Sequence, residues 1–241
     1  MADNLLYHEE KKMKALVVGG TRGFGKEVSN SLIRKGYSII TVSRSKNGLK
    51  NAIHYHCDVE NTGQWHKTIQ RVLVENKIKA FFFVVGYAKA VEFTGLTAKD
   101  WNDALSRNFL YIALALQEIE KKRAGEDIKI ITIGSQWSYR TGNSKLIPYT
   151  ISKHAVSTLM KDFSERNKTM QANHYCVPTM DTPGYRKVRE SFRKLGKMEG
   201  ILNQPTEESK EISNAVVDLA LESRKSGKTY IIHSKERITI L

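Results

Sequence analysis

The sequence of 241 residues has little cysteine, little proline and no long apolar segment. Its two cysteines, Cys57 and Cys176, are too few for a disulfide framework or a thiolate metal site. Only four prolines occur, and no Pro/Gly/Ser-rich linker separates two domains. The longest apolar run, Phe109 to Leu116, is far shorter than the roughly 20 residues that a membrane-spanning helix needs.

The first twelve residues do not have the pattern of a secretory signal. Charged side chains occupy positions 9–12, and the only apolar pair is Leu5-Leu6. The whole chain is 40% hydrophobic and 27% charged, which is enough apolar surface for a sizeable core. These features predict a soluble, cytoplasmic, globular protein with a polar leader at residues 1–12 and no membrane partner.

Basic residues outnumber acidic ones. The 39 Lys and Arg against 25 Asp and Glu give a formal net charge of +14. Such a surplus favours polyanionic partners, which include nucleotides, acidic proteins and nucleic acid. The alternative is a solvated basic surface with no specific partner.

Apolar strands alternate with amphipathic helices along the chain. Strands are expected at 15–18, 38–42, 53–57, 80–85, 128–133, 172–177 and 229–232. Helices are expected after the first strand as far as Gly36, and at 65–74, 100–121, 149–166 and 208–224. This alternation predicts one doubly wound α/β domain, with a parallel sheet covered on both faces and ligands bound at the carboxyl ends of the strands.

A glycine-rich turn follows the first expected strand, with the sequence Val18-Gly19-Gly20-Thr21-Arg22-Gly23-Phe24-Gly25. Glycines allow the backbone to approach a pyrophosphate, which the free N–H groups of the next helix attract. The turn therefore predicts a dinucleotide site, although a plain strand-to-helix turn also uses glycine.

The second expected strand is followed by Ser43-Arg44-Ser45-Lys46, which contains no acidic residue. An acidic residue there would bind the ribose hydroxyls of NAD and repel a 2′-phosphate. Arg44 instead offers a planar fork suited to phosphate, and Arg22 can approach the same point from the glycine turn. We predict NADP(H) as the cofactor; the alternative is two solvated surface arginines.

Four polar residues in order suggest carbonyl chemistry. Tyr149 and Lys153 are four positions apart and share one face of the helix expected there. A phenol has a pKa near ~10, and a nearby ammonium lowers it. Ser135 ends the fifth strand fourteen residues before Tyr149, and Asn108 lies in the preceding helix.

These motifs together resemble the short-chain dehydrogenase/reductase family. The turn has that family's Gly-x-x-x-Gly-x-Gly spacing, and Asn, Ser, Tyr and Lys form its catalytic tetrad. The resemblance extends from about Lys14 to Ile232 and implies a classical-type, NADP-preferring member, with a single Rossmann domain over residues 1–241. In such a member Ser135 would bind the substrate oxygen and Tyr149 would protonate it. Lys153 would orient the nicotinamide ribose and tune Tyr149. Asn108 would hold a water beside Lys153, unless it only satisfies local backbone.

The resemblance also implies further cofactor contacts. Asp58 and Val59 would contact adenine, Gly86 would admit the ribose, and Pro178 and Thr182 would lie near the carboxamide. The chain departs from the family pattern at three places: Val18 replaces threonine, Val85-Gly86-Tyr87-Ala88 replaces Asn-Asn-Ala-Gly, and Thr179 replaces glycine. The connector from Arg44 to Asp58 is short, so a loop is expected in place of the usual helix.

The basic segment 183–205 corresponds to the family's substrate lid. Val188, Phe192, Leu195 and Met198 form an apolar stripe at helical spacing, with six basic residues around it between Arg186 and Lys197. The basic residues of this segment could attract an acidic substrate or carrier. The alternative is that the segment is an ordinary amphipathic surface helix. Aromatic residues that could line the pocket, or simply pack in the core, are Tyr87, Trp137 and Tyr139.

Three functions remain open from sequence. The leading one is an NADPH-dependent reductase of a ketone or aldehyde, acting on a small-molecule or carrier-tethered substrate and assembling as a homodimer or homotetramer. The second is a catalytically weak NADP(H)-binding regulatory or scaffold protein. The third, a nucleic-acid binder, rests only on the charge. His54, His56 and His66 show no metal-ligand spacing, so no metal site is expected.

Overall fold

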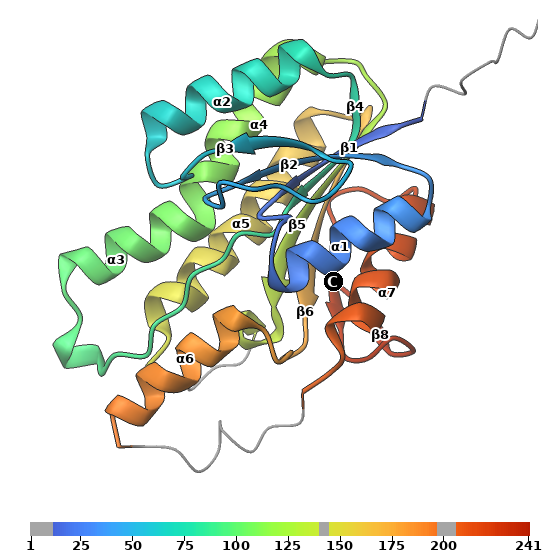
Figure 1. Cartoon of the computed structure of the whole chain (residues 1–241). Coiled ribbons are helices and arrows are strands. Elements are labelled where there is room, and N and C mark those ends of the chain that lie inside the picture. The colour runs from blue at the N-terminus through green and yellow to red at the C-terminus, as the bar shows by residue number, and fades with distance from the viewer. Residues whose placement is uncertain (1–11, 140–144, 197–205) are drawn as a thin grey trace, which may run out of the picture.

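The computed structural model describes residues 12–139, 145–196 and 206–241, and within these ranges helices flank an eight-stranded sheet (Figure 1). The strands are β1 (Lys14–Val18), β2 (Ser38–Ser43), β3 (Ile53–His56), β4 (Ile78–Phe83), β5 (Ile128–Ser135), β6 (Met170–Val177), β7 (Thr229–Ile232) and β8 (Ile238–Ile240). The α-helices are α1 (Gly23–Arg34), α2 (Thr62–Glu75), α3 (Ala98–Leu105), α4 (Tyr111–Arg123), α5 (Ile147–Arg166), α6 (Pro183–Lys194) and α7 (Ser209–Glu222).

The strand order confirms the doubly wound prediction. It runs β3-β2-β1-β4-β5-β6-β7-β8, and β1 pairs in parallel with β2 on one side and with β4 on the other. This reversal of strand order at β1 is a topological switch point, where the crevice beyond the carboxyl ends of the strands takes ligands. The last strand, β8, pairs antiparallel with β7 and was not predicted.

Two apolar cores hold the sheet between its helices. On β1, Leu16 and Val18 pack into the core shared with α2, α4 and α5. The alternate residues Ala15 and Val17 pack into the core shared with α1 and α7, which lie together on the other face (Figure 1). Because both faces of β1 are covered, its sequence is continuously apolar. This packing fixes the carboxyl ends of the strands along one edge.

The helix expected over 100–121 is interrupted. A π-helical segment, Ser106–Leu110, separates α3 from α4 and contains Asn108. π-Bulges occur often at functional sites. Asn108 is completely buried and hydrogen-bonds to Tyr87 and Ser152, which are distant in sequence. Helical periodicity in the sequence does not report such contacts, so it did not predict the π-helical segment.

The connector between β2 and β3, the leader and the lid were also described from sequence. Residues 44–52 contain no helix, as predicted for the short connector between β2 and β3. The leader lies outside the described residues apart from Lys12, and so does part of the lid, including Lys197 and Met198. Among the described helices, none is long and apolar enough to cross a membrane.

Candidate functional site

Two adjoining cavities lie at the carboxyl ends of the central strands. The larger measures about 330 Å³ and the smaller about 190 Å³, and the two share lining residues in the glycine turn and in the loop after β4. Of the residues predicted from sequence, the larger cavity is lined by Gly19, Arg22, Gly23, Phe24, Gly25, Gly86, Ser135, Tyr149, Lys153, Pro178 and Thr182. The smaller is lined by Gly19, Thr21, Arg22, Ser43, Arg44, Asp58, Val59 and Gly86. Only Gly20 and Asn108 of the predicted set line neither cavity.

The glycine turn is tightly folded between β1 and α1. A Cβ on Gly25 would collide with the carbonyl oxygen of Gly19, whose φ of +87° also favours glycine. Ser29 braces the turn, because its hydroxyl lies 3.1 Å from the carbonyl oxygen of Gly20 and 3.0 Å from that of Gly25. Sequence reasoning missed Ser29, which supplies a hydroxyl brace that Val18 cannot.

The start of α1 can receive an anion. Its N-cap residue, Arg22, makes no side-chain capping hydrogen bond, and the first turn contains no acidic residue. The first N–H groups of the helix are therefore left without a side-chain acceptor, and the helix dipole favours a negative charge there. Together with the close approach permitted by the glycines, this arrangement fits the pyrophosphate of a dinucleotide.

Hydroxyl groups and arginines meet beyond the end of β2. The Thr21 hydroxyl lies 2.9 Å from the Ser43 hydroxyl and 3.3 Å from that of Ser45. Arg44 is more than half exposed and lies beside them in the chain, and Arg22 lines the same small cavity. The nearest charged groups to Arg44 are Glu60 at 3.5 Å and Asp58 at 3.9 Å. Hydroxyl and guanidinium donors that line one cavity are suited to a phosphate.

His54 anchors the loop that carries these hydroxyls. Its Nε2 donates to the carbonyl oxygen of Ser45 at 2.8 Å, because a carbonyl can only accept. In the neutral ring, Nδ1 then accepts from the Thr41 hydroxyl at 2.8 Å. His54 thus ties the loop to the sheet. Its sequence position gave no sign of this role, since both contacts depend on the tertiary fold.

Burial sets the protonation of the Tyr149 and Lys153 pair. Burial raises the pKa of Tyr149 to about 12, and the hydrogen bond with Ser135 only partly opposes the effect. Burial also lowers the pKa of Lys153 to about 8, while its Nζ donates to the carbonyl oxygen of Ile133 at 2.8 Å. The prediction that the ammonium of Lys153 lowers the pKa of Tyr149 is therefore wrong for this structure, because burial has the larger effect. The phenol is protonated at neutral pH, as a proton donor to a carbonyl must be.

Asn108 joins the loop after β4 to the helix that carries Tyr149. Its Oδ1 accepts from the backbone N–H of Tyr87 at 2.8 Å, and its Nδ2 donates to the carbonyl oxygen of Tyr87 at 2.8 Å. The same Nδ2 donates to the hydroxyl of Ser152 on α5 at 3.0 Å. These partners are far away in sequence, so Asn108 does not merely satisfy its own helix. It braces the segment in which the usual side-chain amides are missing.

Aromatic and apolar side chains also line the larger cavity. Tyr87 and Trp137 line it, and the Trp137 indole donates to the Thr179 hydroxyl at 3.1 Å. Tyr139, which the sequence left open between pocket lining and packing, is not among the lining residues, and its hydroxyl donates to that of Ser157 at 2.8 Å.

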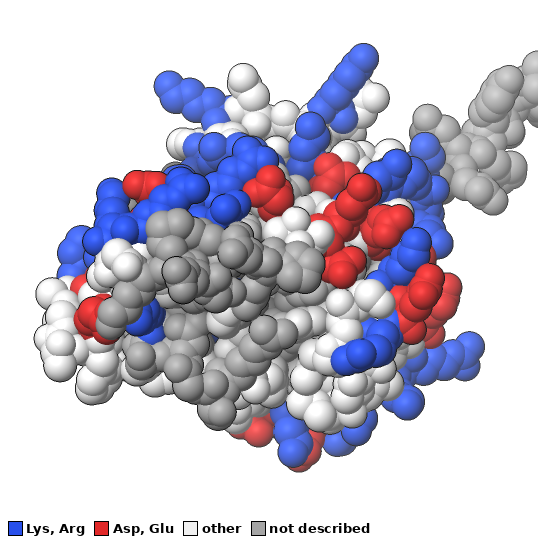
Figure 2. All heavy atoms as spheres, turned by 90° about the horizontal axis from the view of Figure 1, so that it is seen from below, with Lys and Arg blue, Asp and Glu red and all other residues white. Residues whose placement is uncertain are grey.

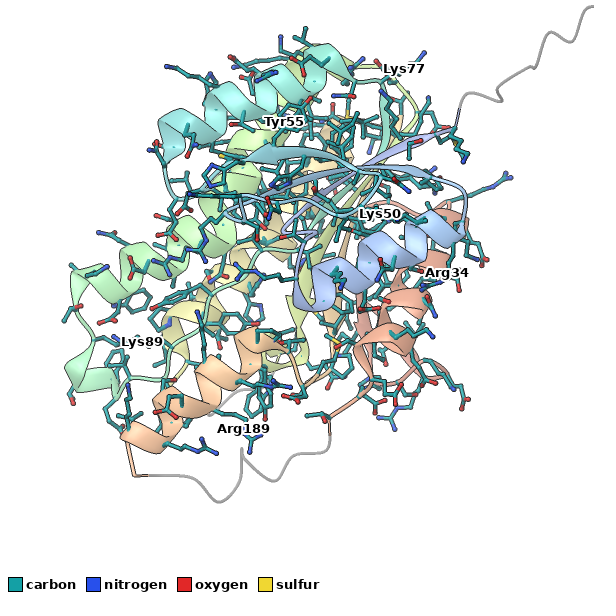
Figure 3. All side chains as sticks on the ribbon, viewed as in Figure 1. Arg34, Lys50, Tyr55, Lys77, Lys89 and Arg189 are labelled. Carbon is teal, nitrogen blue, oxygen red and sulfur yellow. The ribbon has the colours of Figure 1, made fainter. Side chains whose placement is uncertain are left out.

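Helix α6, within the segment predicted to be a substrate lid, lines one side of this cavity. The apolar stripe faces inward: Val188 and Phe192 line the cavity, and Phe192 is buried. Five cations and one carboxylate lie along α6, and Arg189 extends from it in Figure 3. In Figure 2, which is seen from below, Lys and Arg gather toward the left, the side on which α6 lies in Figure 1.

No group of His, Cys, Asp and Glu within the described ranges could hold a metal ion. His174 and Cys176 lie close together against Gly134, behind the site. Burial lowers the pKa of His174 to about 3 and raises the pKa of Cys176 to about 12, so both are neutral at physiological pH. Neither has the character of a reactive group.

A family model described as short chain dehydrogenase matches residues 13–192. The chain belongs to the short-chain dehydrogenase family. It is accordingly an oxidoreductase of the short-chain type, as the sequence motifs predicted.

Relatives of this short-chain dehydrogenase are distant in sequence but similar in length. The 3-oxoacyl-(acyl-carrier-protein) reductase FabG of Buchnera aphidicola (strain APS) is 23% identical over 227 residues, covering 87% of this chain and 90% of the relative. The aldohexose dehydrogenase of Thermoplasma acidophilum, in ligand-free form, superimposes with a TM-score of 0.79 at 21% identity, over 92% of both chains. A variant of actinorhodin polyketide ketoreductase with NADPH gives a TM-score of 0.81 at 18% identity, over 92% of this chain and 96% of that one. These structural matches support the Rossmann-like fold.

Proposed function

We propose that this protein is an NADPH-dependent reductase that converts a ketone or aldehyde to an alcohol, or catalyses the reverse reaction. The observation that carries the proposal is the placement of Tyr149 in one cavity with Ser135, Lys153 and the glycine turn. The names of FabG and of the polyketide ketoreductase, both carbonyl reductases, support the same reaction class.

Each polar residue of the cavity has its own role in the reduction. When bound, NADPH supplies the hydride that the carbonyl carbon accepts. Ser135 donates a hydrogen bond to the carbonyl oxygen and holds it beside Tyr149, which transfers its phenolic proton to that oxygen. Lys153 binds the nicotinamide ribose and returns a proton to Tyr149. Asn108 positions the loop and helix around them and retains one Oδ1 lone pair toward a water. In the reverse direction Tyr149 removes the proton.

The test is an assay of NADPH consumption over a panel of ketones and aldehydes, including carrier-tethered ketoacyl groups, with NADH as comparator. Consumption that requires both NADPH and a carbonyl is expected. NADPH binding without turnover on any carbonyl would instead favour the alternative, a regulatory or scaffold protein on the same fold. The presence of Ser135, Tyr149 and Lys153 argues against that alternative. The segment after β4 lacks the family's side-chain amides, but Asn108 holds it through two hydrogen bonds to the backbone of Tyr87.

The cofactor preference has its own test in Arg44. A charge-assisted contact with a phosphate contributes roughly 1.5–3 kcal/mol, and about 1.4 kcal/mol is a tenfold change in affinity. We expect NADPH to bind more than tenfold tighter than NADH, and Arg44→Asp to reverse the order. Calorimetric titration of both cofactors measures this. Lys50→Asp, on the same loop but absent from the cavity lining, is the control for net charge. Equal Kd values in the unmodified protein would contradict the assignment.

The basic face of α6 is proposed to attract an acidic substrate or carrier protein. Exposed charges act mainly on association and are screened by salt. Lys187→Gln combined with Arg193→Gln, both exposed on α6, is expected to raise the apparent KM roughly threefold to tenfold at low ionic strength, with little change in kcat and a smaller effect at high salt. Lys67→Gln with Lys168→Gln, exposed on other faces, is the matched control. An unchanged KM at low salt would leave α6 as an ordinary amphipathic helix.

The proposal includes a cytoplasmic location and assembly as a homodimer or homotetramer. The family resemblance implies pairing through the helices that follow β4 and β5. Ile151, on the outer side of α5, is 46% exposed, which is compatible with an apolar contact there. Light scattering of the purified chain measures the assembly.

A further inference from the structure

Four of the five charged side chains that line the smaller cavity are linked by ion pairs. The Glu60 carboxylate lies between two arginines: its Oε1 is 2.7 Å from Nε of Arg107 and 3.5 Å from a terminal nitrogen of Arg44. The same Arg44 nitrogen is 3.9 Å from Asp58. The proposed phosphate-binding arginine therefore shares its acidic neighbour with a second arginine, Arg107, which the sequence motifs did not single out.

Arg107 is held in place, whereas Arg44 is not. The Arg107 guanidinium lies 4.3 Å from the centre of the Tyr87 ring, a cation–π distance, and its side chain is only 23% exposed. Tyr87 is fixed in turn, because the neighbouring Asn108 binds both backbone groups of Tyr87. Arg44 is 56% exposed and makes only the two longer contacts.

This asymmetry determines what Glu60 does at the phosphate subsite. An unpaired carboxylate there would hold Arg44 for itself and repel a phosphate by charge. Arg107 forms the shorter ion pair with Glu60 and is less exposed than Arg44, although its Nε makes no hydrogen bond. It offsets the Glu60 charge, so Arg44, whose hydrogen bond to Glu60 is 3.5 Å long, can turn to another anion. Glu60 and Arg107 together then contribute little net charge, and the remaining arginines, Arg22 and Arg44, outnumber the one remaining carboxylate, Asp58.

We propose that Arg107 is a specificity-determining residue, which holds Glu60 so that Arg44 remains available to the 2′-phosphate of NADP(H). The inference rests on the proposed cofactor preference and adds a residue outside the glycine turn and the loop after β2. It assigns Arg107 a positioning role toward Glu60 rather than a contact with the phosphate.

The experiment is a double-mutant cycle on cofactor binding, with Arg107→Met, Glu60→Gln and the two combined. Methionine keeps an unbranched chain against Tyr87 and removes only the charge. Kd values for NADPH and NADH are measured by calorimetry, without turnover. Arg107→Met is expected to weaken NADPH binding about fivefold to fiftyfold and to leave NADH within about twofold. Adding Glu60→Gln should restore NADPH affinity to within about threefold of the unmodified protein.

The control is a second arginine with nearly the same contacts outside both cavities. Arg71 on α2 lies 2.7 Å from Glu75 and 5.5 Å from the ring centre of Tyr55, which Figure 3 labels beside α2. Arg71→Met removes the same charge and should leave both Kd values unchanged.

Four results would overturn the inference. An NADPH preference that survives Arg107→Met, or an equal loss in Arg71→Met, would remove Arg107 from specificity. A loss in Arg107→Met that Glu60→Gln does not restore would mean that Arg107 binds the phosphate directly. Equal Kd values for NADPH and NADH in the unmodified protein would overturn the cofactor preference itself, and this inference with it.

Discussion

Tyr149→Phe is expected to lower carbonyl turnover by about 10²–10⁴-fold while leaving the Kd for NADPH nearly unchanged. The substitution removes only the hydroxyl that donates the proton and keeps the ring that fills the cavity wall. Steady-state assays on any carbonyl that the panel identifies measure turnover, and calorimetry measures binding.

Tyr139→Phe is the matched control for the proton donor. It also removes one phenolic hydroxyl close to the site, but that hydroxyl is bound to Ser157 and lies outside the cavity. Turnover in Tyr139→Phe should remain near that of the unmodified protein. Retained activity in Tyr149→Phe would show that another group donates the proton.

Lys153→Met is expected to abolish turnover and at the same time to stabilise the fold at neutral pH. Burial lowers the pKa of Lys153 from 10.5 to about 8, so the folded protein disfavours the ammonium that the unfolded chain carries freely. This difference corresponds to roughly 3 kcal/mol, from which the lost hydrogen bond to Ile133 subtracts about 1 kcal/mol. Functional residues often destabilise the fold in this way, because the groups that a reaction requires are not those that packing favours.

The pH dependence of this gain follows from the direction of the pKa change. Below a pH of about 8 the folded protein carries the unfavourable charge, so the stabilisation by Lys153→Met is complete. As pH rises from about 8 toward 10.5, only the unfolded chain still binds the proton, and the unmodified protein gains stability until the difference disappears. Thermal unfolding of both proteins across this range measures it. Lys161→Met, exposed on the same helix, should show no such dependence. A destabilised Lys153→Met at neutral pH would contradict the account.

The sequence predicted the parts of this molecule that depend on local pattern. The apolar run of β1, the glycine turn and the one-turn spacing of Tyr149 and Lys153 are short-range signals, because each constraint lies within a few residues of the chain. The structure places the β1 side chains in the two cores and brings the glycine turn, Tyr149 and Lys153 to one cavity. Ser135, fourteen residues before Tyr149, was predicted from the family resemblance and lines the same cavity.

Other features depend on contacts between distant segments and were missed or misjudged. The π-helical segment around Asn108 is tied to Tyr87 and Ser152, which helical periodicity does not report. Arg107 meets Glu60 only after folding. The phenol pKa was misjudged because its largest determinant is burial, which the sequence does not give, rather than the neighbouring lysine.

The most direct measurement is the transfer of a hydrogen label. The protein is incubated with NADPH that carries deuterium at the transferable position of the nicotinamide and with a carbonyl from the panel, and the alcohol is analysed by mass spectrometry. We expect the deuterium to appear on the carbinol carbon, with far less transfer from NADH labelled at the same position and almost none in Tyr149→Phe. NADPH that stays fully labelled with every carbonyl, although it binds the protein, would contradict the proposed reductase.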